Sequence, residues 1–171
     1  QHSRPPDQVL AEVGARLSAG HREIVLTGVH IGAYGQDRQS EPGGQHDLWG
    51  LIGRILTETS VERLRLSSIE PWDLPERALE LWRDPRLCRH LHLPLQSGCD
   101  ATLQRMGRRY DTAAFAGLVR VARAAIPGLA VTSDLIVGFP GETEAEFARS
   151  LAFVEEMAFA RLHVFPYSIR E

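Results

Sequence analysis

The sequence contains no lysine and no asparagine, and all 19 of its basic residues are arginine. With a formal net charge of −3, the chain lacks the positive excess that marks a general nucleic-acid-binding surface. Any contact with RNA must therefore be local, and Arg105, Arg108 and Arg109 form the densest basic cluster. For Arg105 and Arg109 the alternative is a solvated helix end, where cations interact favourably with the last turn.

Cysteine is also scarce, because the chain has only Cys88 and Cys99 and no CxxC spacing. This excludes a zinc ribbon or a self-contained iron–sulfur site within the chain and gives no support for a disulfide framework. We expect each cysteine to be a small buried hydrophobe. No apolar run approaches the roughly 20 residues of a membrane helix, and no signal-peptide pattern opens the chain. We therefore expect a cytoplasmic protein without a membrane partner.

The chain is long enough for one hydrophobic core, with 171 residues, of which 43% are hydrophobic and 24% are charged. Helical and strand patterns alternate along it, which is typical of a parallel sheet covered by helices. Because a full β/α barrel needs roughly 250 residues, we predict a partial parallel β/α barrel, an incomplete TIM-like fold with about five strands. The expected helices lie between Pro5 and Gly20 and at 47–59, 75–84, 100–106, 112–126 and 143–158, and the expected strands at 23–28, 63–68, 90–95, 129–137 and 161–167.

Polar residues collect where the predicted strands end. In a parallel sheet these ends share one rim, and that rim is the functional face of a β/α barrel. Carboxylates, hydroxyls, an amide and glycines together suit a polar ligand that bears a ribose and charged ends. The long segment 29–46 is predicted to be a working loop or a flexible excursion. The rim residues are Thr27–His30, Ser67–Glu70, Gln96–Ser97, Ser133–Asp134 with Gly138, and Pro166–Ser168.

Five motifs carry a family resemblance. LPLQSGCDATLQRMGRRY, followed by SDLIVGFPGETEAEF, resembles the radical S-adenosylmethionine (SAM) barrel in its methylthiotransferase branch. TGVHIGAYG, LRLSSIEPWDL and LHVFPYS resemble the enzymes of that branch that methylthiolate N6-threonylcarbamoyladenosine beside the tRNA anticodon. The motifs occur in order over essentially the whole chain, and their joint occurrence is far more specific than any one of them.

The resemblance implies residues for the methionine end of SAM. Gln96 and Ser97 would meet the ribose and the methionine part, and Arg108 would bind the methionine carboxylate. Glu70 matches a carboxylate that lies close to the SAM amino group. The loop 28–34 takes the place of the family's glycine-rich element, although the usual GGE sequence is absent there. By themselves, a Gln-Ser pair can simply begin a helix and Glu70 can be a solvated loop carboxylate.

The nucleoside end of SAM has its own implied residues. Asp134 would contact a ribose or amino group, although it could also simply satisfy a turn. Ile136 and Gly138 would pack near the adenine, and Phe165 would offer backbone contacts to the adenine edge. Gly138 has a physical reason as well, because a glycine at a strand end leaves space for a flat ring.

The family's [4Fe-4S] cluster is held by a CxxxCxxC loop, which this segment lacks. The resemblance therefore implies that residues 1–171 are the central part of a radical SAM barrel domain, truncated at both ends. The first strand with its cluster loop, an N-terminal methylthiotransferase domain with a second cluster and a C-terminal TRAM domain would lie outside it. We assign no catalytic residue and no metal ligand to the segment, and we expect it to be inactive alone.

In the intact enzyme, reductive cleavage of SAM would give methionine and a 5′-deoxyadenosyl radical during methylthiolation of adenosine C2. The implied partners are a tRNA substrate and an electron donor that reduces the cluster. The cofactors carry the radical chemistry, whereas the protein orients the reactants and excludes water.

Other functions stay open at this point. Another radical SAM enzyme is one alternative, such as an isopentenyladenosine or ribosomal-protein methylthiotransferase or a coproporphyrinogen oxidase, although SSIEP and FPYS favour the tRNA enzyme. A metal-dependent β/α-barrel hydrolase is another, with His90 and His92 on a metal and Asp134 as base. Leu91 and Leu93, on the alternate face of that strand, favour ordinary packing instead. An RNA- or protein-binding piece without activity is the third alternative.

Overall fold

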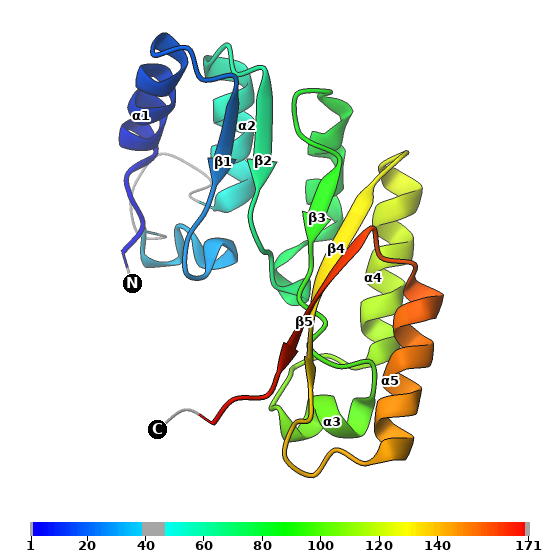
Figure 1. The fold of residues 1–171 in the computed structure, drawn as a ribbon. Helices are drawn as coiled ribbons and strands as arrows, with labels where there is room; N and C mark the ends of the chain where they lie inside the picture. The colour runs from blue at the N-terminus through cyan, green and yellow to red at the C-terminus, as the bar shows by residue number, and fades with distance from the viewer. Residues whose placement is uncertain (1, 39–46, 170–171) are drawn as a thin grey trace.

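The computed structural model describes residues 2–38 and 47–169. Five parallel strands follow one another along the chain: β1 (Glu23–Leu26), β2 (Arg63–Leu66), β3 (His90–His92), β4 (Ala130–Val137) and β5 (Arg161–Pro166). β1 pairs with β2, and β3, β4 and β5 form a second ladder (Figure 1). A bridge from Ser68 to His92 joins the two ladders, so the strands line up in chain order. The predicted partial parallel β/α barrel is confirmed.

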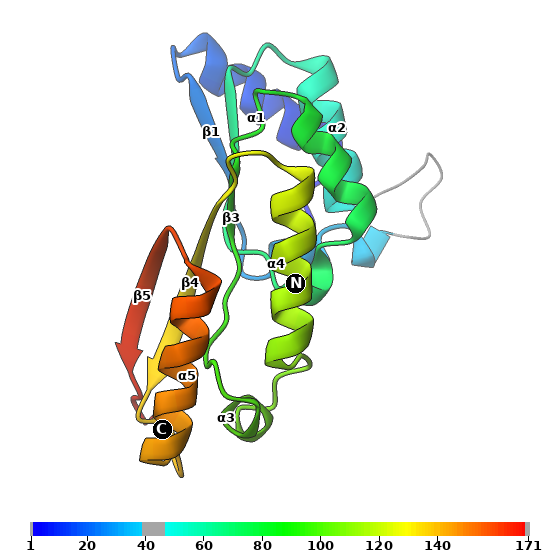
Figure 2. The ribbon, with the colours of Figure 1, turned by 90° about the vertical axis from the view of Figure 1, so that its right-hand side faces the viewer.

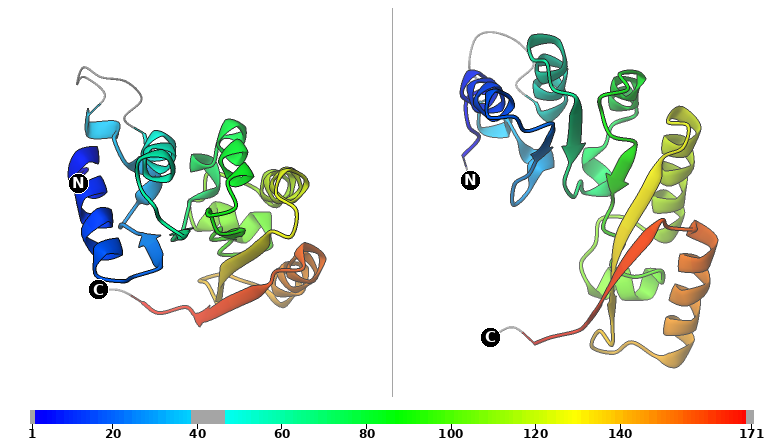
Figure 3. Two further views of the ribbon diagram at one scale, coloured as in Figure 1. Left: turned by 90° about the horizontal axis from the view of Figure 1, so that it is seen from above. Right: turned by 45° about the horizontal axis from the view of Figure 1, so that its top comes forward.

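Five α-helices cover one face of this sheet and leave the other face open (Figures 2 and 3). Three begin at the predicted caps. The carboxylates of Asp47 and Asp111 each accept a hydrogen bond from an amide of the first turn, and Thr143 forms a capping box with Glu146. Such caps satisfy amides that have no partner within the helix. The helices are α1 (Pro6–Ser18), α2 (Leu48–Glu58), α3 (Asp100–Arg105), α4 (Thr112–Ala125) and α5 (Glu144–Met157). Within the described residues, none is long and apolar enough to cross a bilayer.

The strand alternation gives the two faces of the sheet opposite character. Leu64, Leu91 and Leu135 point toward the helices and are buried in one core. Their neighbours along the strands, such as Arg65 and Asp134, lie on the open face and are partly exposed. Because side chains in a strand alternate between faces, one apolar set and one polar set result. The open face of this barrel segment is therefore mainly polar, with apolar side chains such as Phe165 among the polar ones.

Local structure differs from prediction at several elements. β1 and β2 end at Leu26 and Leu66 rather than at residues 28 and 68. The predicted helix 75–84 is a 3-10 helix over Glu76–Arg83. Strand β3 ends at His92 rather than at residue 95, because Pro94 has no amide hydrogen for the ladder and Gln96 adopts a left-handed φ of 67°. In the long loop, residues 31–33 and 36–38 form 3-10 turns, and residues 39–46 lie outside the described part of the chain.

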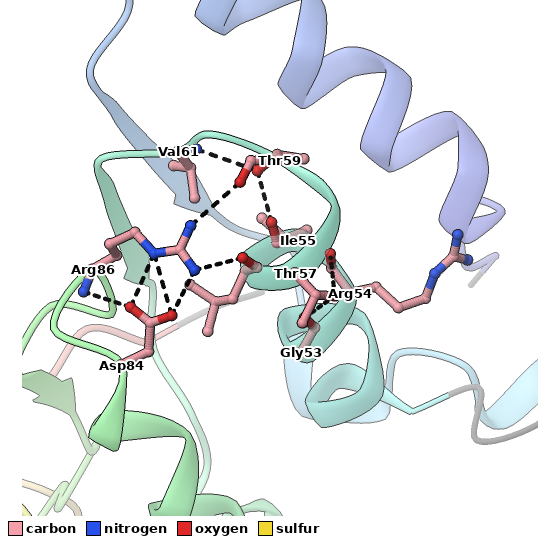
Figure 4. Close-up of polar contacts among 9 residues, drawn as sticks. Gly53, Arg54, Ile55, Thr57, Thr59, Val61, Asp84 and Arg86 are labelled. Atoms are coloured by element: carbon pink, nitrogen blue, oxygen red, sulfur yellow. Dashed lines mark hydrogen bonds and ion pairs between the residues drawn. The ribbon is translucent and has the colours of Figure 1, made fainter.

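Arg86 ties helix α2 to the segment that leads into β3 (Figure 4). Its guanidinium donates to the Asp84 carboxylate, with an Nη2–Oδ2 distance of 2.6 Å, and to the carbonyl oxygens of Leu56 and Thr59 at the end of α2. The last carbonyls of a helix have no partner within it, and a cation there also interacts favourably with the helix dipole. This side chain holds α2 against the edge of β2 and β3.

Candidate functional site

The segment that follows β2 lies beside the end of β3, and the segment that follows β3 lies beside β4, so these segments form one rim. A parallel bridge pairs Gln96 with Leu135 beyond the end of β3. The backbone N–H of Gln96 donates to the backbone carbonyl of Asp134 (2.8 Å), and the backbone N–H of Ile136 donates to the backbone carbonyl of Gln96 (2.9 Å). The left-handed conformation of Gln96 is thus held by hydrogen bonds on both sides, and such held conformations cluster at binding sites. Gln96, Asp134 and Ile136 are brought together as predicted.

Glu70 and Arg108 meet at this rim although they are far apart in the sequence. The distance from Glu70 Oε2 to Arg108 Nη1 is 3.9 Å, and the two side chains are 28% and 25% exposed. Glu70 Oε2 and Arg108 Nε are both buried and have no hydrogen-bond partner among the described residues. Unpaired buried polar atoms are costly, and charged ones especially so. The pair thus places one negative and one positive group at the rim, each with an atom that lacks a hydrogen-bond partner among the described residues.

Tyr110 anchors the segment that carries Arg108, and sequence reasoning missed it. Helix α3 is followed by Gly107, whose φ of 68° lets the chain turn back. The Tyr110 hydroxyl lies 2.8 Å from the Pro94 carbonyl oxygen and 2.9 Å from that of Leu95, which pins this segment to the rim. Burial raises the pKa of Tyr110 to about 12, so the hydroxyl keeps its proton at neutral pH. An aromatic residue directly after an arginine pair is the signal that could have found it.

Arg105 lies in the last turn of α3, as the helix-end interpretation expects, and it also pairs with a carboxylate of another helix. Its guanidinium donates to the two Glu146 carboxylate oxygens, at 3.1 and 2.7 Å, and so joins α3 to α5. The hydrogen bonds from Arg105 and from the Thr143 amide lower the pKa of Glu146 to about 2. Arg109 instead lies over the ring of Trp72, 5.9 Å from its centroid. Arg105 is thus a structural cation, whereas Arg109 stays at the surface.

Asp134 lies between two histidines on the open face. Its Oδ2 is 3.0 Å from His92 Nε2, and its Oδ1 is 3.2 Å from His163 Nδ1. His90 does not join this group, because its Nε2 contacts the Thr132 hydroxyl at 3.0 Å. Of the two histidines predicted as metal ligands of a hydrolase and the aspartate predicted as its base, His92 and Asp134 meet and His90 does not. Sequence reasoning missed His163, which lies opposite Asp134 in the β4–β5 register.

The remaining predicted residues occupy different positions around the rim. Ser97 is fully buried, and its hydroxyl accepts from the Cys99 amide at 3.2 Å. Ser133, expected among the polar rim residues, is instead buried, and its hydroxyl bonds to the backbone of Leu93 and Leu95 just beyond β3. Ile136 and Phe165 are register partners on β4 and β5, and Phe165 is half-exposed. Gly138 is exposed with a φ of 73°, which explains the glycine by backbone conformation. The contacts of these residues with SAM stay predictions.

Solved structures share the fold of this chain. Coproporphyrinogen III oxidase (HemN) from Escherichia coli superimposes with a TM-score of 0.57 and 24% identity, over 70% of this chain and 29% of that chain. The cobalamin-dependent SAM radical enzyme OxsB gives a TM-score of 0.62 with 15% identity, over 88% of this chain and 22% of that chain. Both likenesses concern the fold alone.

Sequence relatives define the family. The family model described as Radical SAM superfamily matches residues 1–154. The threonylcarbamoyladenosine tRNA methylthiotransferase MtaB of Bacillus subtilis (strain 168) is 44% identical over 170 residues, which is 98% of this chain and 37% of that protein. The tRNA-2-methylthio-N(6)-dimethylallyladenosine synthase of Parafrankia sp. (strain EAN1pec) is 42% identical over 171 residues, 99% of this chain and 34% of that protein. The chain thus spans little more than a third of these relatives. It belongs to the radical SAM superfamily.

Proposed function

We propose that this chain forms the SAM-binding rim of an enzyme that methylthiolates C2 of N6-threonylcarbamoyladenosine in tRNA. The observation that carries the SAM site is the Glu70–Arg108 pair, with one buried atom on each side that has no hydrogen-bond partner. The methionine end of SAM carries an ammonium and a carboxylate. The ammonium would pair with Glu70 Oε2 and the carboxylate with Arg108, in charge-assisted hydrogen bonds.

The neighbouring rim residues suit the nucleoside end of SAM. Asp134 offers carboxylate oxygens to a ribose hydroxyl, and Gln96 lies beside it through the backbone bond to Asp134. Ile136 and Phe165 offer apolar surface from adjacent strands, and the exposed backbone at Gly138 leaves room for a flat ring. When bound, SAM and a reduced [4Fe-4S] cluster supply the radical chemistry. The residues of this chain bind SAM, orient it and keep water away from it.

The cysteines of this chain do not fit a cluster that needs three thiolates. Cys88 and Cys99 are both buried, and along the chain Cys88 precedes β3 whereas Cys99 follows it. We therefore infer that the cluster ligands belong to parts of the protein beyond these 171 residues, as do the TRAM and methylthiotransferase domains. A tRNA substrate, an electron donor and a cytoplasmic location complete this proposal.

The identities of 44% and 42% to the two kinds of relative do not separate them. The proposed tRNA nucleoside is therefore supported by motifs alone. SSIEP and FPYS resemble the threonylcarbamoyladenosine branch. The test supplies the intact, cluster-reconstituted protein with tRNA that carries either N6-threonylcarbamoyladenosine or isopentenyladenosine. We expect mass spectrometry of the digested tRNA to show one added methylthio group on the former. Modification of isopentenyladenosine alone would contradict the substrate proposal.

Elemental analysis of the intact protein tests the reaction class separately. Iron together with acid-labile sulfide is expected from a radical SAM enzyme. Stoichiometric zinc without iron or sulfide would contradict the proposed function.

A further inference from the structure

We propose that His92, Asp134 and His163 form a binding site for a divalent transition-metal cation, with Zn²⁺ as its best-suited ligand. The three side chains each offer one ligand atom, and these atoms lie within 4.8 Å of one another. Two imidazole nitrogens and one carboxylate oxygen form a donor set that suits Zn²⁺ and neighbouring metals such as Co²⁺. The site shares Asp134 with the proposed SAM site and goes beyond SAM binding, because two histidines that no proposed SAM contact uses complete it.

Three adjacent strands supply the ligands. His92 ends β3, Asp134 is in the middle of β4, and His163 lies on β5 opposite Asp134 in the register. His92 pairs with Thr132, two residues before Asp134 and on the same face of the sheet. The backbone ladder therefore fixes all three Cα positions, and a metal would need only small side-chain movements.

A second layer of contacts orients His92. The Thr132 hydroxyl lies 2.9 Å from His92 Nδ1 and 3.0 Å from His90 Nε2. Because a hydroxyl has a single proton, Thr132 donates to one of these nitrogens and accepts from the other. When it accepts from His92 Nδ1, the lone pair of His92 Nε2 faces Asp134 Oδ2 at 3.0 Å. In that tautomer a metal ion would bridge the two acceptor atoms, whereas in the other tautomer a proton on His92 Nε2 does so. Metal-binding histidines are commonly held by a hydrogen bond of this kind at the other ring nitrogen.

The surroundings leave the site accessible from one side. The side chains of His92 and Asp134 are 11% and 23% exposed, whereas that of His163 is 44% exposed. The protein thus encloses two ligands, and solvent reaches the third. A bound cation would have three protein ligands and an open position for water, which is the arrangement of accessible zinc sites rather than closed structural ones.

The test is a titration of the intact protein, its cluster retained, with Zn²⁺ by calorimetry and with Co²⁺ by X-ray absorption. We expect one equivalent to bind and the Co²⁺ spectrum to show nitrogen and oxygen coordination. His163→Gln should weaken Zn²⁺ binding at least about tenfold, in line with the effect of losing a single supporting contact. His21→Gln changes an exposed histidine outside the cluster and should bind as the unaltered chain does.

Two further variants separate the metal site from a general loss of structure. Thr132→Val removes the hydroxyl that orients His92 and should lower Zn²⁺ affinity, whereas Thr132→Ser keeps the hydroxyl and should retain it. Circular dichroism of each variant reports its fold. The proposal is overturned if the unaltered protein binds no stoichiometric Zn²⁺, or if folded His163→Gln binds Zn²⁺ as tightly as the unaltered protein. Neither result bears on the iron, sulfide or tRNA modification of the intact protein, so the proposed function stands or falls separately.

Discussion

Arg105 and Arg108 are three residues apart and each faces a glutamate, yet we expect their loss to have opposite effects. Arg108→Gln in the intact protein should weaken SAM binding. A hydrogen bond to a charged group contributes about 1.5–3 kcal/mol, and each 1.4 kcal/mol changes Kd about tenfold. Because solvent reaches a quarter of the Arg108 side chain, we expect the lower part of that range, a rise in the Kd of SAM of roughly 10- to 30-fold. Calorimetry with matched iron and sulfide contents measures it.

The same substitution should leave the folded state almost unchanged. Arg108 Nε has no hydrogen-bond partner among the described residues, and the Glu70 oxygen nearest the guanidinium is 3.9 Å away. Arg105→Gln is the matched control, because it removes two hydrogen bonds to Glu146 that join α3 and α5. We expect it to lower the thermal midpoint while the Kd of SAM stays unchanged. The reasoning is refuted if Arg108→Gln binds SAM normally, or if it destabilises the fold as much as Arg105→Gln does.

Three stability predictions follow from contacts away from the rim. The pKa of Glu146 is lowered from 4.5 to about 2, so this carboxylate should stabilise the fold fully above pH 4.5 and progressively less as the pH falls toward 2. Glu146→Gln should reduce the fall of the thermal midpoint between pH 4.5 and 2. An unchanged fall would contradict the assignment. Arg86→Ala should lower the free energy of unfolding in urea by about 1–3 kcal/mol, because Asp84 and the last carbonyls of α2 lose their hydrogen-bond donor. Arg86→Lys should recover part of this loss. Equal stability of the alanine variant and the unaltered chain would refute the prediction. Gly98→Ala should cost about 1–3 kcal/mol, since its Cβ would lie 2.6 Å from the Ser150 carbonyl oxygen, whereas Gly53→Ala, in open space on α2, should cost nothing.

Features that depend on nearby residues were predictable from the sequence. The caps at Asp47, Asp111 and Thr143 are confirmed, because capping is a contact between residues three apart. The alternation that puts Leu91 into the core and His92 on the open face also follows from strand geometry.

Features that depend on the register between distant segments were not predictable. His163 meets Asp134 only because β5 pairs with β4 in one register, and Arg105 finds Glu146 across 41 residues. Sequence patterns give the faces of a strand but not its alignment with a neighbour, and a shift by one residue would reverse every side chain. The position of the rim could be predicted from the sequence, whereas the side-chain contacts within the rim could not.

A crystal structure of the intact, cluster-containing protein with SAM tests the central claim most directly. We expect the methionine ammonium to bind Glu70 Oε2 and the methionine carboxylate to bind Arg108, so that both atoms gain the partners they lack. A structure in which SAM binds elsewhere while Glu70 Oε2 and Arg108 Nε stay unpaired would contradict the account.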